Sequence, residues 1–318
     1  HSGGDPPSPA ANAAAAIAMT SSAVTTQKIS SVGPWTDPLV LSISHLTRYT
    51  YEGAVQDSFN EARLQPITDS LQQCRDFKFQ LDPASSVRDY PDFYANCVHY
   101  FDVPQPHESL EVVAVSEVQT LVESRGPIPS ADKESLEVAS VKEQHFDFLH
   151  ASEFVSLGAD VWREAVDALP NGLQDVWTDT IAIGQHIHRN YKYTPLSTNV
   201  NTRADEVIKK KQGVCQDFTH LMLGICRTHG IPARYVSGYF LNQHKLPGEI
   251  EASHAWIEVF IPNYGWKGYD PTHRRESDTR YVKLAVGRDY ADIRPVGGTF
   301  RGKGTRKMVV EVSVLRLG

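Results

Sequence analysis

Cys215 stands at a position where a thiol is readily activated. It begins a strongly helical run that ends at His229, and Gly230 directly after the run is a usual helix stop signal. The first N–H groups of a helix are unpaired, and its N-terminus carries partial positive charge. Both features favour a thiolate at Cys215, and a free N–H there could donate to an oxyanion. The alternative for this residue is a buried cysteine that only packs in the core.

A histidine and an aspartate follow in an arrangement that predicts a β-hairpin. His254 opens an alternating, β-branched run, and Asp270 closes a second short strand 16 residues later. Because the turn residues 262–265 lie between them, the two side chains should be close together on adjacent strands. With Cys215 they would form a nucleophile, a base and an orienting acid. We expect His254 to deprotonate Cys215, and Asp270 to hold the His254 tautomer through the Nδ1 hydrogen.

Zinc binding is the rival interpretation of the helical run. The residue types of Cys215, His220, Cys226 and His229 match those of zinc ligands. Cys215 and Cys226 are 11 residues apart, which is about 16 Å along a helix. One ion with bonds of about 2.3 Å cannot bridge that length, and neither can a disulfide. We therefore expect no metal here, no cofactor for the chemistry, and a core-packing role for Cys226.

The elements that must position these residues follow from the change in hydrophobic period along the chain. From about residue 150 the spacing of apolar residues is helical, and strand-like runs follow after His229. Helices followed by strands predict an α+β catalytic core over 151–318.

The preceding part of the chain has a different pattern. Residues 38–120 alternate with period two in short runs separated by turn residues, which predicts a β-rich, β-sandwich-like domain. The polar stretch 121–150 is expected to be a linker between the two domains. Residues 1–37 are rich in Ala, Ser, Pro and Gly and are expected to be a disordered tail.

Composition excludes several classes of protein. The chain has 318 residues, a net charge of −7 and 41% hydrophobic residues, which is ordinary for a globular protein. A mildly acidic chain lacks the basic surface that nucleic-acid binding needs. The sequence contains no run of about 18 apolar residues, so it predicts no membrane-spanning helix. Four cysteines favour a reducing compartment, so we expect a cytoplasmic protein, with a secreted or periplasmic one as the alternative. The sequence leaves open whether Cys74 and Cys97 pair.

Three stretches resemble the bacterial transglutaminase-like family, which shares the papain-like Cys-His-Asp fold. They read GVCQDFTHLMLGICRTHGIPARYVSGY, ASHAWIEVFIPNYGWKGYDPTH and VGRDYADIRPV. Upstream, HLTRY and NEARLQP are similar to the β-rich N-terminal region often joined to these cores. The resemblance implies that Cys215 is the nucleophile, His254 the base and Asp270 the third member of the triad. His273 stands where the family pattern has Asn, which is expected to alter substrate contacts and to leave the triad intact.

Four further residues are secondary candidates for the oxyanion hole or for substrate contact. Tyr191 and Tyr193 precede the nucleophile at the end of a helix, and a hydroxyl there could complete the oxyanion hole, although core packing is the more usual role of such aromatics. Gln216 follows the nucleophile and could cap the helix start. Trp256 could form a wall of the cleft, but a Trp on a buried strand more often packs in the core.

Arg274 and Arg275 follow Asp270 closely in the sequence. Two adjacent cations near the predicted site could attract a substrate that carries a carboxylate. Exposed arginines more commonly serve only as solvated surface.

The predicted function is that of a thiol hydrolase that cleaves an amide or peptide bond in a peptide or protein substrate through a Cys215 thioester. A transglutaminase, which passes the acyl group from glutamine to an amine, is the alternative, because both reactions begin with the same acyl transfer. A catalytically inactive binding module is a further alternative, against which the intact triad argues. The sequence indicates no partner for the N-terminal domain.

Overall fold

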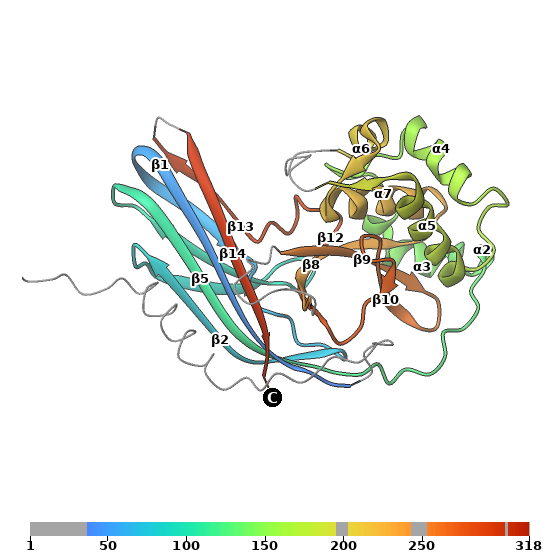
Figure 1. Cartoon of the computed structure of the whole chain (residues 1–318), viewed down its shortest axis with the longest axis horizontal. Helices are drawn as coiled ribbons and strands as arrows, with labels where there is room; N and C mark the ends of the chain where they lie inside the picture. The colour runs from blue at the N-terminus through green and yellow to red at the C-terminus, as the bar shows by residue number, and fades with distance from the viewer. Residues whose placement is uncertain (1–36, 195–202, 243–252, 303–304, 318) are drawn as a thin grey trace, which may run out of the picture.

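The structure is a computed structural model that describes residues 37–194, 203–242, 253–302 and 305–317. The predicted tail, except for Asp37, lies outside these residues. The described part contains one curved β-sheet, a group of helices and a second β-sheet (Figure 1). Within it, no helix is both long and apolar enough to cross a membrane.

A single curved sheet takes the place of the predicted sandwich. Its strand order is β2-β5-β1-β4-β3, and the sheet forms a half-barrel (Figure 1). The strands are β1 (Val40–Ala62), β2 (Gln72–Asp82), β3 (Val87–Pro91), β4 (Cys97–Val103) and β5 (His107–Thr120). Buried and half-buried residues alternate along the first half of β1, as the period-two pattern predicts.

The sheet bends because β1 is long enough to change partners. Its first half pairs with β5, and residues 58–62 pair with β4 after a register shift between Thr50 and Val55. Gly53 lies in this region with φ of +103°, a conformation that glycine adopts without steric cost. The five strands thus belong to one hydrogen-bonded sheet, and the sandwich-like description of the N-terminal domain is not confirmed.

The C-terminal end of the chain completes this first sheet. Strands β13 (Val296–Arg301) and β14 (Arg306–Arg316) both pair antiparallel with β1. The division into 38–120 and 151–318 differs from this arrangement, since the last two strands of the predicted catalytic core lie in the N-terminal sheet. Without them, β1 would present an unpaired edge along its first half.

The stretch between the two regions contains short helices. These are α2 (Lys133–Leu136), α3 (Ala139–Gln144) and the 3₁₀ turn η2 (Phe146–Phe148). Leu136 and Phe148 are buried, so the predicted linker packs against the molecule along part of its length.

Four helices and a five-stranded sheet form the second region. The helices are α4 (Ala159–Ala168), α5 (Val176–Asn190), α6 (Ala204–Lys210) and α7 (Cys215–Thr228). The sheet has the order β11-β10-β9-β8-β12, with β8 (Ala233–Phe240), β9 (His254–Ile261), β10 (Gly265–Asp270), β11 (Arg275–Glu276) and β12 (Tyr281–Gly287). A short parallel pair, β6 (Lys192–Tyr193) with β7 (Gln212–Gly213), lies before α7. The expected α+β arrangement is present here.

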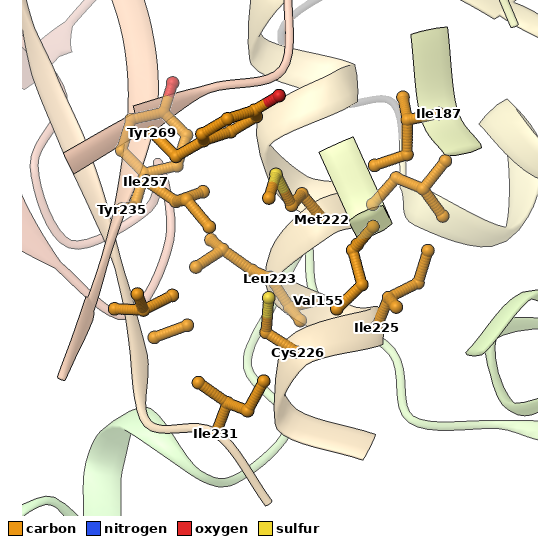
Figure 2. Close-up of a cluster of buried hydrophobic side chains, with 14 of the residues drawn as sticks. Val155, Ile187, Met222, Leu223, Ile225, Cys226, Ile231, Tyr235, Ile257 and Tyr269 are labelled. Atoms are coloured by element: carbon orange, nitrogen blue, oxygen red, sulfur yellow. The ribbon is translucent and has the colours of Figure 1, made fainter. Parts of the chain in front are cut away.

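Helix α7 lies in the middle of the second core. Met222, Leu223 and Ile225 on α7 are fully buried, and Figure 2 shows Leu223 on the side of the helix that faces Ile257 of β9. Cys226 is also fully buried in this cluster, which confirms its predicted packing role (Figure 2). A helix enclosed in this way has little freedom to move, so the position of its first residue is well defined.

Candidate active site

Cys215 is the first residue of α7, as the helical pattern predicts. Its side chain is partly exposed and carries a free thiol. The Asp217 carboxylate accepts a hydrogen bond from the backbone N–H of Val214 at 2.8 Å, which fixes the turn into the helix. A Cβ atom at Gly213 would lie 2.7 Å from the Cβ of Asp217, so only glycine fits this approach. The thiol therefore lies at a rigid helix N-terminus, where free N–H groups and the helix dipole favour negative charge.

The predicted hairpin brings His254 and Asp270 together. Strands β9 and β10 are antiparallel, with Tyr269 opposite Ile257, and they place His254 at the start of one strand and Asp270 at the end of the other. His254 Nε2 donates to Asp270 Oδ2 at 2.7 Å, and their side chains are 10% and 0% exposed. The predicted use of Nδ1 for this bond is wrong. Because Nε2 is taken by Asp270, Nδ1 is the nitrogen left for the hydrogen bond that His254 makes with the Cys215 side chain.

The buried carboxylate keeps His254 protonated. Burial by itself lowers the pKa of His254, but the negative charge of Asp270 and the hydrogen bonds with Asp270 and Cys215 outweigh burial and raise this pKa to about 10. For Asp270, burial raises the pKa, yet the facing imidazoles of His254 and His273 bring it well below its usual range. At neutral pH, an imidazolium therefore faces the Cys215 sulfur, with an ionised carboxylate behind it.

Asp270 has more partners than the sequence indicates. Its Oδ2 atom also accepts from the Tyr281 hydroxyl at 2.8 Å and from His273 Nδ1 at 2.7 Å. Its Oδ1 atom accepts from the backbone N–H groups of Thr272 at 2.8 Å and His273 at 3.2 Å. Sequence reasoning missed Tyr281, which no local motif marks, and assigned His273 to substrate contacts. In the structure, His273 donates a hydrogen bond to the Asp270 carboxylate.

The secondary candidates separate into residues near the thiol and residues away from it. The Tyr191 hydroxyl is held by Lys211 Nζ at 2.9 Å, in a cluster with Glu164, so it is not directed at Cys215. Tyr193 is about half exposed, and its pKa is raised first by burial and then by the nearby charges of Cys215 and Asp270. It therefore lies beside the site.

Trp256 and Gln216 complete this set. Trp256 is buried and stacks on the His254 ring, with 6.1 Å between ring centroids, and it also lines a pocket of about 650 Å³. Gln216 is partly buried directly after Cys215.

The residues proposed for the rival zinc site have other partners. His220 Nε2 accepts from the backbone N–H of Tyr290 at 3.3 Å, and its ring stacks on Phe154. His229 Nε2 bonds the backbone oxygen of Ala165 at 2.9 Å. Within the residues that the structure describes, the group closest to a metal-ligand arrangement is His254, Asp270 and His273, whose ligand atoms already bond one another.

We expect Cys215 to be the most reactive thiol of the chain. Burial raises the pKa of Cys74 and of Cys97, and it raises that of Cys226 to about 12. At pH about 6, iodoacetamide should modify Cys215 well before the other three, because Cys215 is partly exposed at a helix N-terminus and faces an imidazolium, a setting typical of reactive cysteines. Peptide mapping by mass spectrometry measures the order. Equal labelling of Cys215, Cys74 and Cys97 would contradict the assignment.

Substitution of Tyr281 tests the support of the carboxylate. The Tyr281→Phe variant removes one donor from Asp270 and keeps the ring, so we expect kcat/KM to fall by about three- to tenfold, the worth of a modest hydrogen bond. Tyr239→Phe is a matched control, because Tyr239 is equally buried but bonds His45 in the other core. A Tyr281→Phe rate equal to that of the control variant would show that this bond does not matter for activity.

A helix that presents a cysteine to a His–Asp pair on an antiparallel sheet has the residue types and the placement of a Cys-His-Asp site. Comparison with known proteins places the chain more narrowly. Residues 165–271 match the transglutaminase-like superfamily, and residues 41–119 match the bacterial transglutaminase-like N-terminal region. The chain belongs to the transglutaminase-like superfamily.

The chain is similar to bacterial proteins in sequence and to a solved structure in fold. An uncharacterized protein of Mycobacterium leprae is 32% identical over 297 residues, which cover 87% of this chain and 99% of that protein. A protein-glutamine gamma-glutamyltransferase of Pseudomonas aeruginosa is 34% identical over 95 residues, 27% of this chain and 14% of that enzyme. A protein from Cytophaga hutchinsonii, provisionally named a cysteine protease, superposes with a TM-score of 0.70 at 22% identity over 89% of this chain and 92% of its own. This last likeness establishes a shared fold.

Proposed function

We propose that the chain is a thiol hydrolase that cleaves an amide or peptide bond through a thioester on Cys215. The observation that carries this proposal is the buried His254–Asp270 pair. The ring nitrogen of His254 that does not bond Asp270 faces Cys215, which lies at a helix N-terminus. A cysteine placed in this way needs no metal or organic cofactor to attack an acyl group.

The reaction follows from the positions of the groups. The Cys215 thiolate attacks the amide carbon, and backbone N–H groups at the start of α7 stabilise the oxyanion that forms. The C–N bond then breaks, and His254 donates its proton to the departing nitrogen, which leaves as ammonia or an amine. Neutral His254 next accepts a proton from water, which attacks the thioester. The acid product leaves, and the thiolate–imidazolium pair is regenerated.

Transfer to an amine is the second candidate, because the first half of the reaction is the same. The local identity to the Pseudomonas aeruginosa gamma-glutamyltransferase supports it. Hydrolysis is favoured because water is always present, whereas transfer requires a site that holds an amine and excludes water. The complete triad geometry argues against the third candidate, an inactive binding module.

The test of this proposal is the fate of the acyl group. The protein is incubated with a library of Gln-containing peptides, with and without a primary amine, and the products are identified by mass spectrometry. We expect cleavage or deamidation in both samples. Amine adducts as the main product would favour the transferase, and no Cys215-dependent product in either sample would overturn both activities.

The Asp270→Asn variant should change both the rate and its pH dependence. Without the carboxylate charge, burial dominates and the pKa of His254 falls from about 10. Since His254 must be protonated to expel the leaving group, the basic limb of the pH–rate profile should move to lower pH. The loss of kcat/KM should be on the order of 10–10³, below the roughly 10⁴ known for the equivalent change in a serine-protease triad, because a thiol needs less activation. An unchanged profile at the wild-type rate would show that Asp270 is only structural.

A further inference from the structure

Three arginines border a pocket at the turn that follows Asp270. The pocket has a volume of about 370 Å³ and lies between the end of α5 and the turn that joins β10 to β11. Arg189 contributes from α5, Arg274 from the turn and Arg275 from the start of β11. Arg274 and Arg275 also line a second, larger pocket of about 650 Å³.

These arginines have no carboxylate partners among the residues that the structure describes, although most other arginines there are paired. The single acidic residue that lines the pocket of about 370 Å³ is Glu276, and its carboxylate is already bound to Lys267 Nζ at 3.0 Å. The lining therefore carries three positive charges and one neutralised negative charge, on a chain whose net charge is −7. The Nε atom of Arg275 is buried and has no hydrogen-bond partner within the described part of the chain. An unpaired buried donor is costly unless a ligand satisfies it.

The pairing of β10 with β11 fixes Arg275 next to Asp270. Arg275 is the direct partner of Asp270 in the β10–β11 register. Its guanidinium carbon lies 6.0 Å from the centre of the Phe240 ring, which also packs against His273 and Tyr281, the two side chains that bond Asp270. Arg275 and the two side chains that bond Asp270 therefore share Phe240 as a neighbour.

Arg274 reaches across to the helix. Burial and then the positive charge of Arg274 lower the pKa of His188 on α5, so the two side chains lie near each other. Arg274 has a φ of +52°, in the left-handed region that non-glycine residues seldom adopt. Such strained residues cluster at functional sites, where the surrounding structure holds them.

We propose that Arg189, Arg274 and Arg275 form a carboxylate subsite, which binds an acidic side chain or the C-terminal carboxylate of the peptide whose amide is attacked by Cys215. A guanidinium binds a carboxylate through two parallel hydrogen bonds, and two adjacent arginines can orient it. This inference rests on the proposed function, because it names the class of peptide that the enzyme accepts.

Binding to an inactive variant tests the subsite separately from turnover. Cys215→Ala protein is presented with a library of Gln-containing peptides, in which each flanking position is either Asp or Asn and the C-terminus is either free or amidated. We expect Asp peptides, free-acid peptides or both to bind at least about tenfold more tightly than their neutral counterparts. The two arms distinguish an acidic side chain from a C-terminal carboxylate. Equal binding of the acidic and neutral peptides would overturn the subsite, even if the wild-type enzyme turns peptides over.

Substitutions assign the preference to the arginines. In the Cys215→Ala background, the double variant Arg274→Gln with Arg275→Gln should bind acidic and neutral peptides with affinities that differ by no more than about twofold. Arg88→Gln is the matched control, since Arg88 is an exposed arginine on β3 of the other sheet, and it should keep the full preference. Arg274→Lys with Arg275→Lys keeps the charge and loses the paired hydrogen bonds, so an intermediate value is expected. A preference that survives the double Gln change would overturn the assignment.

A charge-reversal variant distinguishes loss of the subsite from loss of the fold. The Arg275→Glu variant should favour peptides with Lys at the position where the parent favours Asp, an outcome that a misfolded protein cannot give. If a folded Arg275→Glu protein, checked by circular dichroism, keeps the preference for Asp, the inference is wrong. If acidic peptides bind as expected but the wild-type enzyme releases no product from any of them, the subsite stands and the proposed hydrolase function fails.

Discussion

Replacing Cys215 with alanine should abolish acyl transfer, with kcat reduced by a factor on the order of 10⁴ or more. Removal of a serine nucleophile from a comparable triad costs about 10⁶, and the background that survives comes from substrate binding and the oxyanion hole. Cys215 is only partly buried at the start of α7, so its replacement should leave the unfolding temperature nearly unchanged. Steady-state kinetics with a Gln-containing peptide and thermal unfolding measure the two quantities.

Cys97→Ala is the matched control for this experiment. Cys97 is also a partly buried free thiol, but it lies on β4 in the other sheet. We expect this variant to keep full activity. Activity of Cys215→Ala at the level of Cys97→Ala would rule out Cys215 as the nucleophile.

Replacing His254 with alanine should cost a factor on the order of 10³–10⁵ in kcat. The change removes the cation that faces the thiolate and the acid that protonates the leaving nitrogen, and each of these contributes substantially. It also leaves Asp270 buried without one of its partners, so some loss of thermal stability is expected. His150→Ala, a change at an exposed histidine outside the site, should have no effect on the rate.

Chemical rescue separates a catalytic from a structural role of His254. The alanine variant leaves a space beside Cys215 in which free imidazole can bind, so added imidazole should restore part of the rate in a concentration-dependent manner. Folded His254→Ala protein with wild-type activity, or with a defect that imidazole fails to relieve, would argue against His254 as the acid–base group.

The local parts of this architecture could be predicted because local patterns determine them. The helix that begins at Cys215 has apolar residues at helical spacing and a glycine stop, and both signals lie within the helix itself. The His254–Asp270 hairpin was predictable because only a short turn separates two alternating strands. Cys226 was correctly assigned to the core because helical geometry placed it far from Cys215.

The parts that could not be predicted depend on contacts between distant residues. In the pairing of β14 with β1, Leu41 lies opposite Arg316. The alternation of apolar residues within a strand does not indicate which other strand it pairs with. Tyr281 reaches Asp270 from β12, which is separated from β10 by two other strands in the sheet. The choice of Nε2 over Nδ1 at His254 depends on the rotation of one ring. Tyr191 packs in the core, as is usual for such an aromatic, but the partner of its hydroxyl, Lys211, has no sequence signal for that role.

Direct capture of the acyl-enzyme is the most decisive test of the central claim, that Cys215 forms a thioester with the substrate under control of His254 and Asp270. The wild-type protein is mixed with an excess of a Gln-containing peptide, quenched in acid within milliseconds to seconds, and analysed as intact protein and as peptides by mass spectrometry. The account predicts a transient adduct on Cys215 equal to the peptide minus the leaving ammonia or amine. The adduct should be absent from Cys215→Ala and should be released by hydroxylamine. Product formation without any adduct on Cys215, or an adduct on another residue, would contradict it.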